Sequence, residues 1–124
     1  MLLNLSDLAD EPLQSQIVRQ IRAKILTGDL SVGTALPSIR ALAREQHVSV
    51  ITIQRAYETL ERENLIQSRR RKGFFVALLS DERKREMARQ GFQEGLVPLI
   101  QTARNEGLTI KEIGEIVEQI LNRP

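Results

Sequence analysis

The sequence predicts a mostly α-helical protein with one small β-hairpin, in which a compact N-terminal part is followed by a two-helix tail. Three observations lead to this prediction. Apolar residues recur at helical spacing in three successive segments before residue 64. Two short β-prone runs then flank a tight loop that ends in glycine, and two further helical patterns follow after residue 79. We expect a first domain over residues 1–78 and a helical dimerisation region over residues 79–124.

The first helix is expected over residues 12–27. Asp10-Glu11-Pro12 indicates its start, because a capping carboxylate precedes a proline whose missing N–H costs nothing in a first turn. Gly28 marks its end, since glycine readily adopts the left-handed conformation that often follows a helix. We expect residues 28–37 to form a turn region. One apolar stripe at i, i+4 spacing should face the core: Leu13, Ile17, Ile21 and Ile25.

Two shorter helices should follow. Ser38 opens a helix that ends near His47, and Ser49 is a good N-cap for the next one. Asn64 tolerates the left-handed conformation and so marks the end of that third helix. The buried side of the second helix is expected to consist of Ile39, Leu42 and Ala43. The inward stripe of the third helix is expected to consist of Ile53, Ala56, Tyr57 and Leu60.

A β-hairpin is expected after the third helix. Residues 65–68 and residues 74–78 are β-prone runs, and between them lies the basic loop Arg69-Arg70-Arg71-Lys72-Gly73. Three helices followed by a hairpin with a basic tip make a winged helix-turn-helix. The sequence therefore predicts this architecture for residues 1–78.

The tail should form two helices joined by a turn at residues 105–107. Ser80 caps the first of them, whose acidic first turn suits the helix dipole. Pro98 should kink this helix or expose a carbonyl near Glu94. Thr109 and Glu112 have the spacing of a capping box and open the second helix.

The tail helices carry apolar faces that two helices of this size cannot bury in each other alone. These faces could pack on the winged helix of the same chain or on a second copy of the chain. We favour the second copy, because Gly91, Gly95 and Gly114 permit a close approach of helices. The expected dimerisation residues are Phe92, Leu96, Ile100, Ile113, Val117 and Ile120.

The composition argues against an enzyme. The 124 residues include no cysteine and one histidine, so they offer no thiolate zinc site, no cysteine nucleophile and no histidine pair for a metal. No glycine-rich phosphate loop is present either. We therefore expect no catalytic residues, no metal site and no cofactor. No apolar run approaches the roughly 20 residues that span a bilayer, and the N-terminus lacks a signal-peptide pattern, so a cytoplasmic protein is expected.

Positive charge is concentrated in the middle third of the chain. The whole chain has a net charge of only +2. Residues 39–76 contain eight basic and four acidic side chains, a net charge of +4, and four of the eight are consecutive in the hairpin loop. A charge run on its own usually marks a solvated loop. Beside a predicted helix-turn-helix, however, a basic stripe indicates a protein that binds a polyanion.

Spaced motifs run through residues 11–76. They are Pro12-Leu13-x-x-Gln16-Ile17, Gly28-x-Leu30-x-x-Gly33, Leu36-Pro37-Ser38-x-Arg40-x-Leu42-Ala43, Val48-Ser49-x-x-Thr52, Arg55-Ala56-Tyr57-x-x-Leu60 and Gly73-x-x-Val76. In combination they resemble the GntR family of bacterial transcription regulators. The short two-helix tail is similar to that of the YtrA subfamily, whose members lack the large effector domain of their relatives.

This resemblance implies a homodimeric repressor that binds double-stranded DNA at a pseudo-palindromic operator. For the YtrA-like group it also implies control of a neighbouring transporter operon, often the regulator's own. It names no small-molecule effector, and the tail offers no convergent polar groups that would mark a ligand site.

The candidate DNA-binding residues follow from helix-turn-helix geometry, in which the N-terminal residues of the recognition helix reach base edges in the major groove. Ser49 and Thr52 can donate to phosphate, and Gln54 can pair with adenine, while Val50 offers only apolar contact, for instance to a thymine methyl group. The hairpin tip would neutralise phosphates and enter the minor groove. The full candidate set is Ser38, Arg40, Ser49, Val50, Thr52, Gln54, Arg55, Arg70, Arg71, Lys72 and Gly73.

Simpler roles stay open for some of these residues. Thr52 could serve only in the capping turn, Gln54 could face solvent, and Arg55 could hold a phosphate or be solvated. Arg40 matches a position that contacts DNA in the family that the chain resembles. An alternative function is a winged-helix module that binds protein instead of DNA, and the four consecutive basic residues argue against it.

The sequence departs from the resembled family at three positions. Val50 stands where many members have arginine, Arg71 stands where they commonly have the first wing glycine, and Phe74 stands where they commonly have threonine. The first departure affects a base-reading contact, and the second affects how closely the wing backbone approaches the minor groove.

Overall fold

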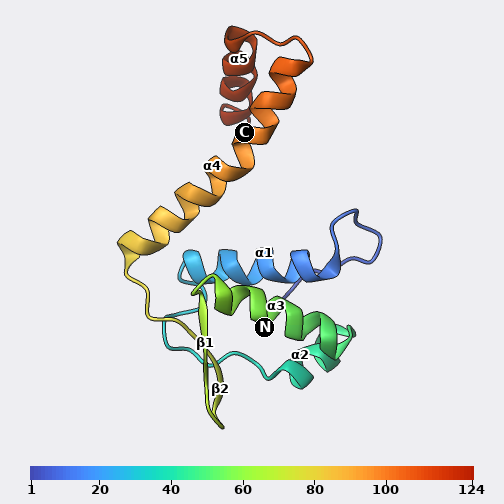
Figure 1. The fold of residues 1–124 in the computed structure, drawn as a ribbon, viewed down its shortest axis with the longest axis vertical. Coiled ribbons are helices and arrows are strands. Elements are labelled where there is room, and N and C mark those ends of the chain that lie inside the picture. The colour runs from blue at the N-terminus through green and yellow to red at the C-terminus, as the bar shows by residue number, and fades with distance from the viewer. The chain divides into compact units, whose positions relative to one another are not determined.

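The structure, a computed structural model, describes residues 1–124 as five helices and one two-stranded antiparallel sheet (Figure 1). The elements are α1 Leu13–Leu26, α2 Ile39–Gln46, α3 Val50–Arg62, β1 Ile66–Arg69, β2 Gly73–Val76, α4 Asp81–Asn105 and α5 Ile110–Leu121. The predicted fold class, mostly α-helical with a small hairpin, is confirmed. None of the helices combines the length and apolarity needed to cross a membrane.

By packing, the chain divides into two units, residues 1–84 and residues 85–124, which are described separately. Unit 1 contains α1, α2, α3 and the hairpin, whereas unit 2 contains most of α4 and all of α5. The division falls inside α4, while the boundary predicted from the sequence lies before that helix.

The core of unit 1 lies between α1, α2, α3 and the sheet, and Figure 1 shows α1 beside α3. The inward stripe predicted for α3 is fully buried. Leu13 and Ile39, which were expected in the core, are only half-buried, because each is the first residue of its helix and lies at the core's edge. The side chains with 0–1% exposure are Ile17, Ile21, Ile25, Leu42, Ile53, Ala56, Tyr57, Leu60, Leu65, Ile66 and Val76.

Local hydrogen bonds set the start of α2 and the turn that joins it to α3. The Ser38 hydroxyl accepts from the Ala41 amide at 3.1 Å and so caps α2. His47 ends α2 in the left-handed conformation, with φ of 57°. Ser49 then caps α3. Short caps of this kind fix the direction in which α3 leaves the turn.

The start of α1 differs from the prediction. Pro12 occupies the N-cap position, and no side chain caps the helix. The Glu11 carboxylate instead accepts hydrogen bonds from the Arg19 guanidinium at 2.9–3.2 Å. This hydrogen-bonded arginine lowers the pKa of Glu11 below its usual value.

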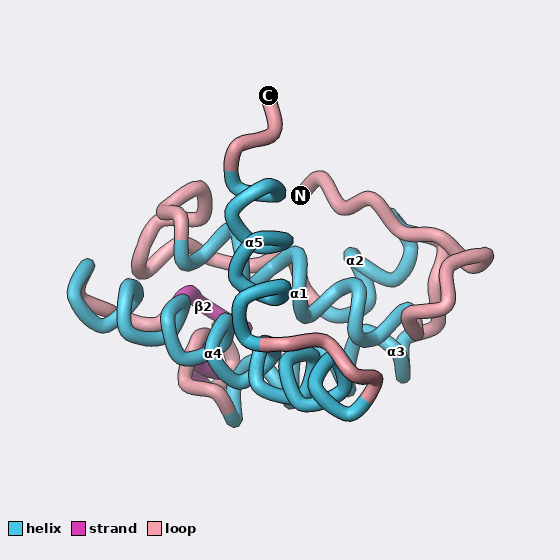
Figure 2. Tube along the Cα trace, turned by 90° about the horizontal axis from the view of Figure 1, so that it is seen from above, coloured by secondary structure: helices cyan, strands magenta, loops and turns pink.

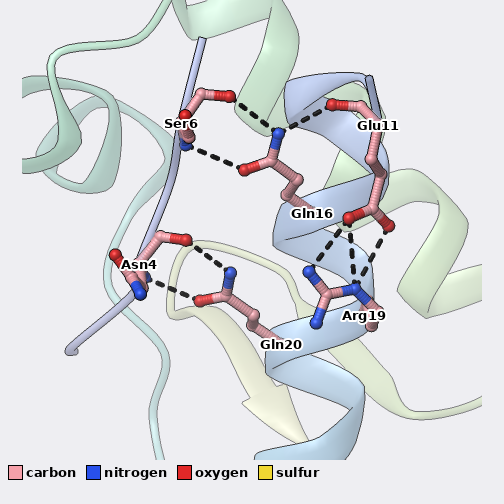
Figure 3. A network of polar contacts seen from close by, with 6 residues as sticks. All are labelled: Asn4, Ser6, Glu11, Gln16, Arg19 and Gln20. Carbon is pink, nitrogen blue, oxygen red and sulfur yellow. Dashed lines mark hydrogen bonds and ion pairs between the residues drawn. The ribbon is translucent and has the colours of Figure 1, made fainter. Parts of the chain in front are cut away.

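The N-terminal residues form an irregular segment, drawn as loop in Figure 2, that two glutamines of α1 hold in place (Figure 3). The Gln16 side-chain amide accepts from the Ser6 N–H at 2.9 Å and donates to the Ser6 carbonyl at 2.9 Å. One turn later, the Gln20 amide pairs with the N–H and carbonyl of Asn4 at 2.7 and 2.8 Å. Each glutamine therefore satisfies both polar groups of one backbone residue, as a neighbouring β-strand would.

The hairpin pairs Ile66 with Val76 and Arg69 with Gly73. A third short segment, residues 33–36, pairs with the other edge of β2, where the Gly33 and Leu36 amides donate to the carbonyls of Val76 and Phe74 at 2.9 Å. The expected turn region at residues 28–37 therefore ends in extended backbone. These extra hydrogen bonds make β2 the central strand and attach the hairpin to the segment before α2.

In the tail, the predicted caps are present. The Ser80 hydroxyl accepts from the Arg83 amide at 3.1 Å, and Thr109 and Glu112 form the reciprocal capping box of α5. Helix α4 continues through Pro98 without ending. Since proline has no N–H, the Glu94 carbonyl receives no hydrogen bond from that position, as expected from the sequence.

The apolar side chains of the tail are largely uncovered in a single chain. No residue of α5 is buried, although its twelve residues include four isoleucines and one valine. Phe92 is 70% exposed, Val117 41% and Ile120 51%, whereas Leu96, Ile100 and Ile113 are half-buried.

Candidate nucleic-acid interface

The first turn of α3 presents one hydroxyl pair. The Ser49 hydroxyl accepts from the Thr52 amide at 3.0 Å, and the Ser49 and Thr52 hydroxyl oxygens lie 2.7 Å apart, within one hydrogen bond. One of the two hydroxyl hydrogens is used in that bond. The pair can therefore donate only one hydrogen bond to a phosphate, whereas the sequence predicted one from each of the two hydroxyls.

The other two side chains of this turn are apolar and open to solvent. Val50 is 45% exposed and Ile51 is 59% exposed. Val50 belongs to the site predicted from the sequence, whereas Ile51 was not included. The sequence does contain a signal for Ile51. The inward apolar stripe of this helix begins at Ile53, so the two residues that follow the N-cap lie outside the stripe and face solvent.

Gln54 and Arg55 lie on the exposed side of α3 one turn further along. The Gln54 amide nitrogen donates to the Glu58 carboxylate at 3.3 Å, a long bond between exposed side chains. Reading a base would require Gln54 to exchange this partner. Arg55 is exposed and forms no ion pair or side-chain hydrogen bond within the chain.

Helix α2 contributes two arginines. Arg40 and Arg44 are both exposed, and neither side chain has a hydrogen bond or ion pair in the chain. Their i, i+4 spacing puts them on one face of α2. Arg44 was not among the predicted residues, and this spacing is the signal that could have identified it. The Ser38 hydroxyl, which was predicted, is occupied as the cap of α2.

The hairpin tip consists of Arg70, Arg71 and Lys72, since Arg69 already pairs with Gly73. The Lys72 amide donates to the Arg69 carbonyl at 3.0 Å and closes the turn. Arg71 and Gly73 both have positive φ, of 65° and 98°. The three tip side chains are exposed and unpaired.

Arg69, at the end of β1, lies over an aromatic ring of the neighbouring strand. Its guanidinium carbon lies 4.5 Å from the centre of the Phe75 ring. This cation–π contact holds the side chain against the strand. Sequence reasoning did not single out Arg69, because the contact depends on the strand register.

Tyr57 links the three elements of the site. Its hydroxyl donates to the Pro37 carbonyl at 2.7 Å, directly before α2. Its ring meets the Phe74 ring of β2 edge to face, with 5.0 Å between centroids and 71° between planes. Burial raises the pKa of the Tyr57 hydroxyl, and the Glu45 carboxylate adds to this shift. Phe74, one of the departures from the resembled family, thus serves to join the wing to α3.

Positive charge is arranged unequally over unit 1. On α1, the basic side chains are neutralised by carboxylates in the pairs Arg19–Glu11 at 2.9 Å, Arg22–Glu63 at 3.1 Å and Lys24–Asp29 at 3.4 Å. Figure 1 shows α2 and the hairpin tip on the side of α3 away from α1. Within unit 1, the basic side chains without any partner in the chain come from α2, α3 and this tip: Arg40, Arg44, Arg55, Arg70, Arg71 and Lys72.

This arrangement has a definite chemical capacity. Unpaired cations neutralise phosphates without first giving up an internal partner. The exposed start of α3 offers a hydroxyl donor, an amide and apolar groups to base edges. The surface on α2, α3 and the hairpin tip is therefore suited to double-stranded nucleic acid.

Known proteins that are similar to this chain include bacterial transcription regulators. Residues 13–76 match the family model described as bacterial regulatory proteins, gntR family. The HTH-type transcriptional regulator YhcF of Bacillus subtilis is 33% identical over 110 residues, which cover 86% of this chain and 88% of that protein. The HTH-type transcriptional repressor YtrA of the same organism is 29% identical over 109 residues, covering 88% of this chain and 84% of that protein.

A solved structure matches nearly the whole chain. The GntR family transcriptional regulator from Listeria monocytogenes superimposes with a TM-score of 0.75 at 28% identity, covering 93% of this chain and 98% of that one. The similarity therefore includes the tail as well as unit 1.

Proposed function

Because this chain belongs to the GntR family and is a DNA-binding transcription regulator of the YtrA-like kind, we propose that it acts as a homodimeric repressor. In this proposal it binds a pseudo-palindromic operator with one half-site for each protomer. Two-fold symmetry in a protein is matched by two-fold symmetry in its site.

The observation that carries the proposal is the separation of paired and unpaired cations. Each basic residue of α1 has a carboxylate partner, whereas six basic residues of α2, α3 and the hairpin tip have no partner of any kind within the chain. An unpaired cation on a protein surface is ready to replace the counterions of DNA. The same pattern argues against a protein-binding winged helix.

In the complex we propose, α3 enters the major groove with its first turn towards the bases. The Ser49–Thr52 pair donates to a phosphate, and Gln54 leaves Glu58 to pair with an adenine. Arg40 and Arg55 hold phosphates beside the groove. Arg70, Arg71 and Lys72 of the tip, supported by the tight turn at Gly73, neutralise phosphates and reach the minor groove.

Dimerisation is assigned to the tail. The six apolar residues Phe92, Leu96, Ile100, Ile113, Val117 and Ile120 are exposed or half-buried in the single chain. Covering them with a second copy removes this apolar surface from water at about 25 cal/mol for each Å². This gain supports the second-copy arrangement over an uncovered tail.

Repression is supported by the name of the Bacillus subtilis relative, a transcriptional repressor. The resemblance to the YtrA-like group supports a neighbouring transporter operon, together with the regulator's own gene, as the target. Deleting the gene should raise the transcripts of that operon, and unchanged or lowered transcripts would contradict repression.

The operator itself gives the test of the proposed function. In footprinting of genomic DNA upstream of the gene, the purified chain should protect two inverted half-sites whose centres lie roughly one helical turn or slightly more apart. Protection of a single asymmetric half-site at saturation would overturn the two-fold model. Protection that does not depend on sequence would overturn specific regulation.

A further inference from the structure

The exposed surface at the start of the recognition helix is apolar. Val50 and Ile51 follow the cap directly and are 45% and 59% exposed. Both are β-branched, so the helix restricts each to essentially one side-chain rotamer. A rigid apolar group loses little entropy when it is buried against a partner. Neither side chain is part of the core of unit 1, because the buried stripe of α3 begins at Ile53.

The polar side chains near Val50 and Ile51 are poorly placed to bind the bases that these two residues would contact. The Ser49 and Thr52 hydroxyls are bonded to each other at 2.7 Å. No cation lies in the first turn, since positions 50–53 are Val-Ile-Thr-Ile. Gln54 is the nearest side chain with an amide, and it lies three residues after Ile51, on the same face of the helix.

We propose that Ile51, with Val50 beside it, reads the C5 methyl groups of thymine in the major groove. Each half-site of the operator then carries thymine opposite the first turn of α3, adjacent to the adenine that Gln54 contacts. This inference rests on the proposed DNA-binding function and names the bases that the start of α3 selects.

Thymine is the base whose major-groove edge suits this pair. It alone presents a methyl group there, whereas cytosine presents an amino donor and guanine presents two acceptors. An isoleucine side chain can accept or donate no hydrogen bond, so it would leave the polar edge of cytosine or guanine unpaired and cut off from water. Val50 and Ile51 therefore favour thymine because they contact its methyl group. They disfavour G·C pairs because they would remove water from polar base edges without replacing its hydrogen bonds.

The test begins with binding-site selection from a random duplex library, using the full chain. The enriched duplex is then synthesised with each thymine replaced in turn by 2′-deoxyuridine, which removes only the methyl group. At one or two positions in each half-site, uridine should weaken binding about fourfold. This factor corresponds to the roughly 0.8 kcal/mol gained by burying one methyl-sized group.

Three variants assign the effect to its residue. In Ile51→Ala the uridine penalty at the contacted position should disappear, because the methyl group then has no partner, and Val50→Ala should reduce the penalty at the neighbouring position. Gln54→Ala is the matched control and should keep the full penalty while losing affinity for the duplex. Circular dichroism should show unchanged helix content, since all three side chains are at or near the surface.

The outcomes separate this inference from the proposed function. An enriched duplex that tolerates uridine everywhere, or a penalty that persists in both Ile51→Ala and Val50→Ala, would overturn thymine reading and leave DNA binding intact. Failure to enrich any sequence would overturn specific DNA recognition itself.

Discussion

Arg71 holds a backbone conformation that its side chain disfavours. Its φ is 65°, in the left-handed region, at the turn that the Lys72 amide closes onto the Arg69 carbonyl. A residue with a Cβ pays about 1–2 kcal/mol there. The resembled family commonly has glycine at this position, so the chain gives up hairpin stability for one more cation at the wing tip.

Substituting glycine at this turn should therefore separate strain from charge. Arg71→Gly should be more stable than the matched variant Arg70→Gly by about 1–2 kcal/mol, because both gain the flexibility of glycine but only Arg71 relieves a positive φ. Thermal unfolding of the two variants measures the difference. Equal stabilities would show that the turn at Arg71 is not strained.

Tyr57 is expected to stabilise unit 1 through one hydroxyl. Tyr57→Phe keeps the ring contact with Phe74 and removes the bond to the Pro37 carbonyl, so it should cost about 0.5–1.5 kcal/mol in the free energy of unfolding. Urea unfolding measures this cost. Phe75→Leu is the control for a general loss of aromatic packing in the wing, because the half-buried Phe75 ring makes no edge-to-face contact with Tyr57. No change in Tyr57→Phe would mean that water replaces the hydroxyl without loss.

Single residues also show where sequence reasoning succeeds. Ser49, Ser80 and Thr109 were recognised as caps, because a cap bonds to a backbone amide only three residues away. Arg44 and Ile51 were not among the predicted residues, although helical spacing offers a local signal for both: Arg44 lies four residues after Arg40, and Ile51 lies outside the inward stripe of α3. That Arg44 has no ion-pair partner could not be predicted, because it depends on every neighbour in the fold.

At the scale of elements, the N-terminal segment depends on the two glutamines of α1. Gln16 is 3% exposed and makes three hydrogen bonds, to Ser6 and to the Glu11 carbonyl, over ten and five residues of sequence. No periodicity predicts such side-chain pairing with irregular backbone. The sequence instead suggested a carboxylate cap at this end of α1, which the structure does not have.

Replacing these glutamines should have unequal effects. Gln16→Ala removes a buried side chain together with its three part-buried hydrogen bonds to Ser6 and Glu11, and should destabilise unit 1 by about 1–3 kcal/mol. Gln20→Ala is the matched control, and it should cost less than 1 kcal/mol because its partners at Asn4 are exposed to water. Limited proteolysis should cut the first ten residues faster in Gln16→Ala. Equal rates in both variants would contradict a dominant role for Gln16.

The sequence pattern also did not predict the extended segment at residues 33–36. Its hydrogen bonds go to β2, about forty residues later in the chain. A run this short has too few residues to show alternation. The hairpin itself was predictable, because its two runs and its glycine-ended loop are contiguous.

At the scale of the whole molecule, the exposed tail predicts self-association. The double variant Val117→Asp, Ile120→Asp places two charges on the apolar face of α5 and should sediment as a monomer. Because a dimer holds two half-sites at once, this variant should also bind the operator about 100-fold more weakly or worse. Analytical ultracentrifugation gives the first result and a binding titration gives the second.

The control for this change is the variant Gln119→Asp, Asn122→Asp, which adds the same charge at exposed polar positions near the end of α5. It should remain a dimer with nearly unchanged affinity. If the Val117 and Ile120 variant stayed dimeric as well, the proposed interface would be wrong.

We expect the unpaired cations of unit 1 to neutralise DNA phosphates and the paired cations of α1 to leave them unneutralised. The decisive measurement is the slope of the logarithm of the binding constant against the logarithm of salt concentration, taken on one operator duplex. Two variants with equal loss of charge are compared: Arg70→Ala, Lys72→Ala at the hairpin tip, and Arg19→Ala, Lys24→Ala on α1. Each lost phosphate contact should flatten the slope by about 0.9, so the tip variant should flatten it by about 3.6 in a dimer.

The α1 variant should leave the slope almost unchanged, because its cations already have carboxylate partners at 2.9 and 3.4 Å. We therefore expect the two variants, which lose the same charge, to differ in slope. Equal slopes for the two variants, or a flatter slope for the α1 variant alone, would contradict it.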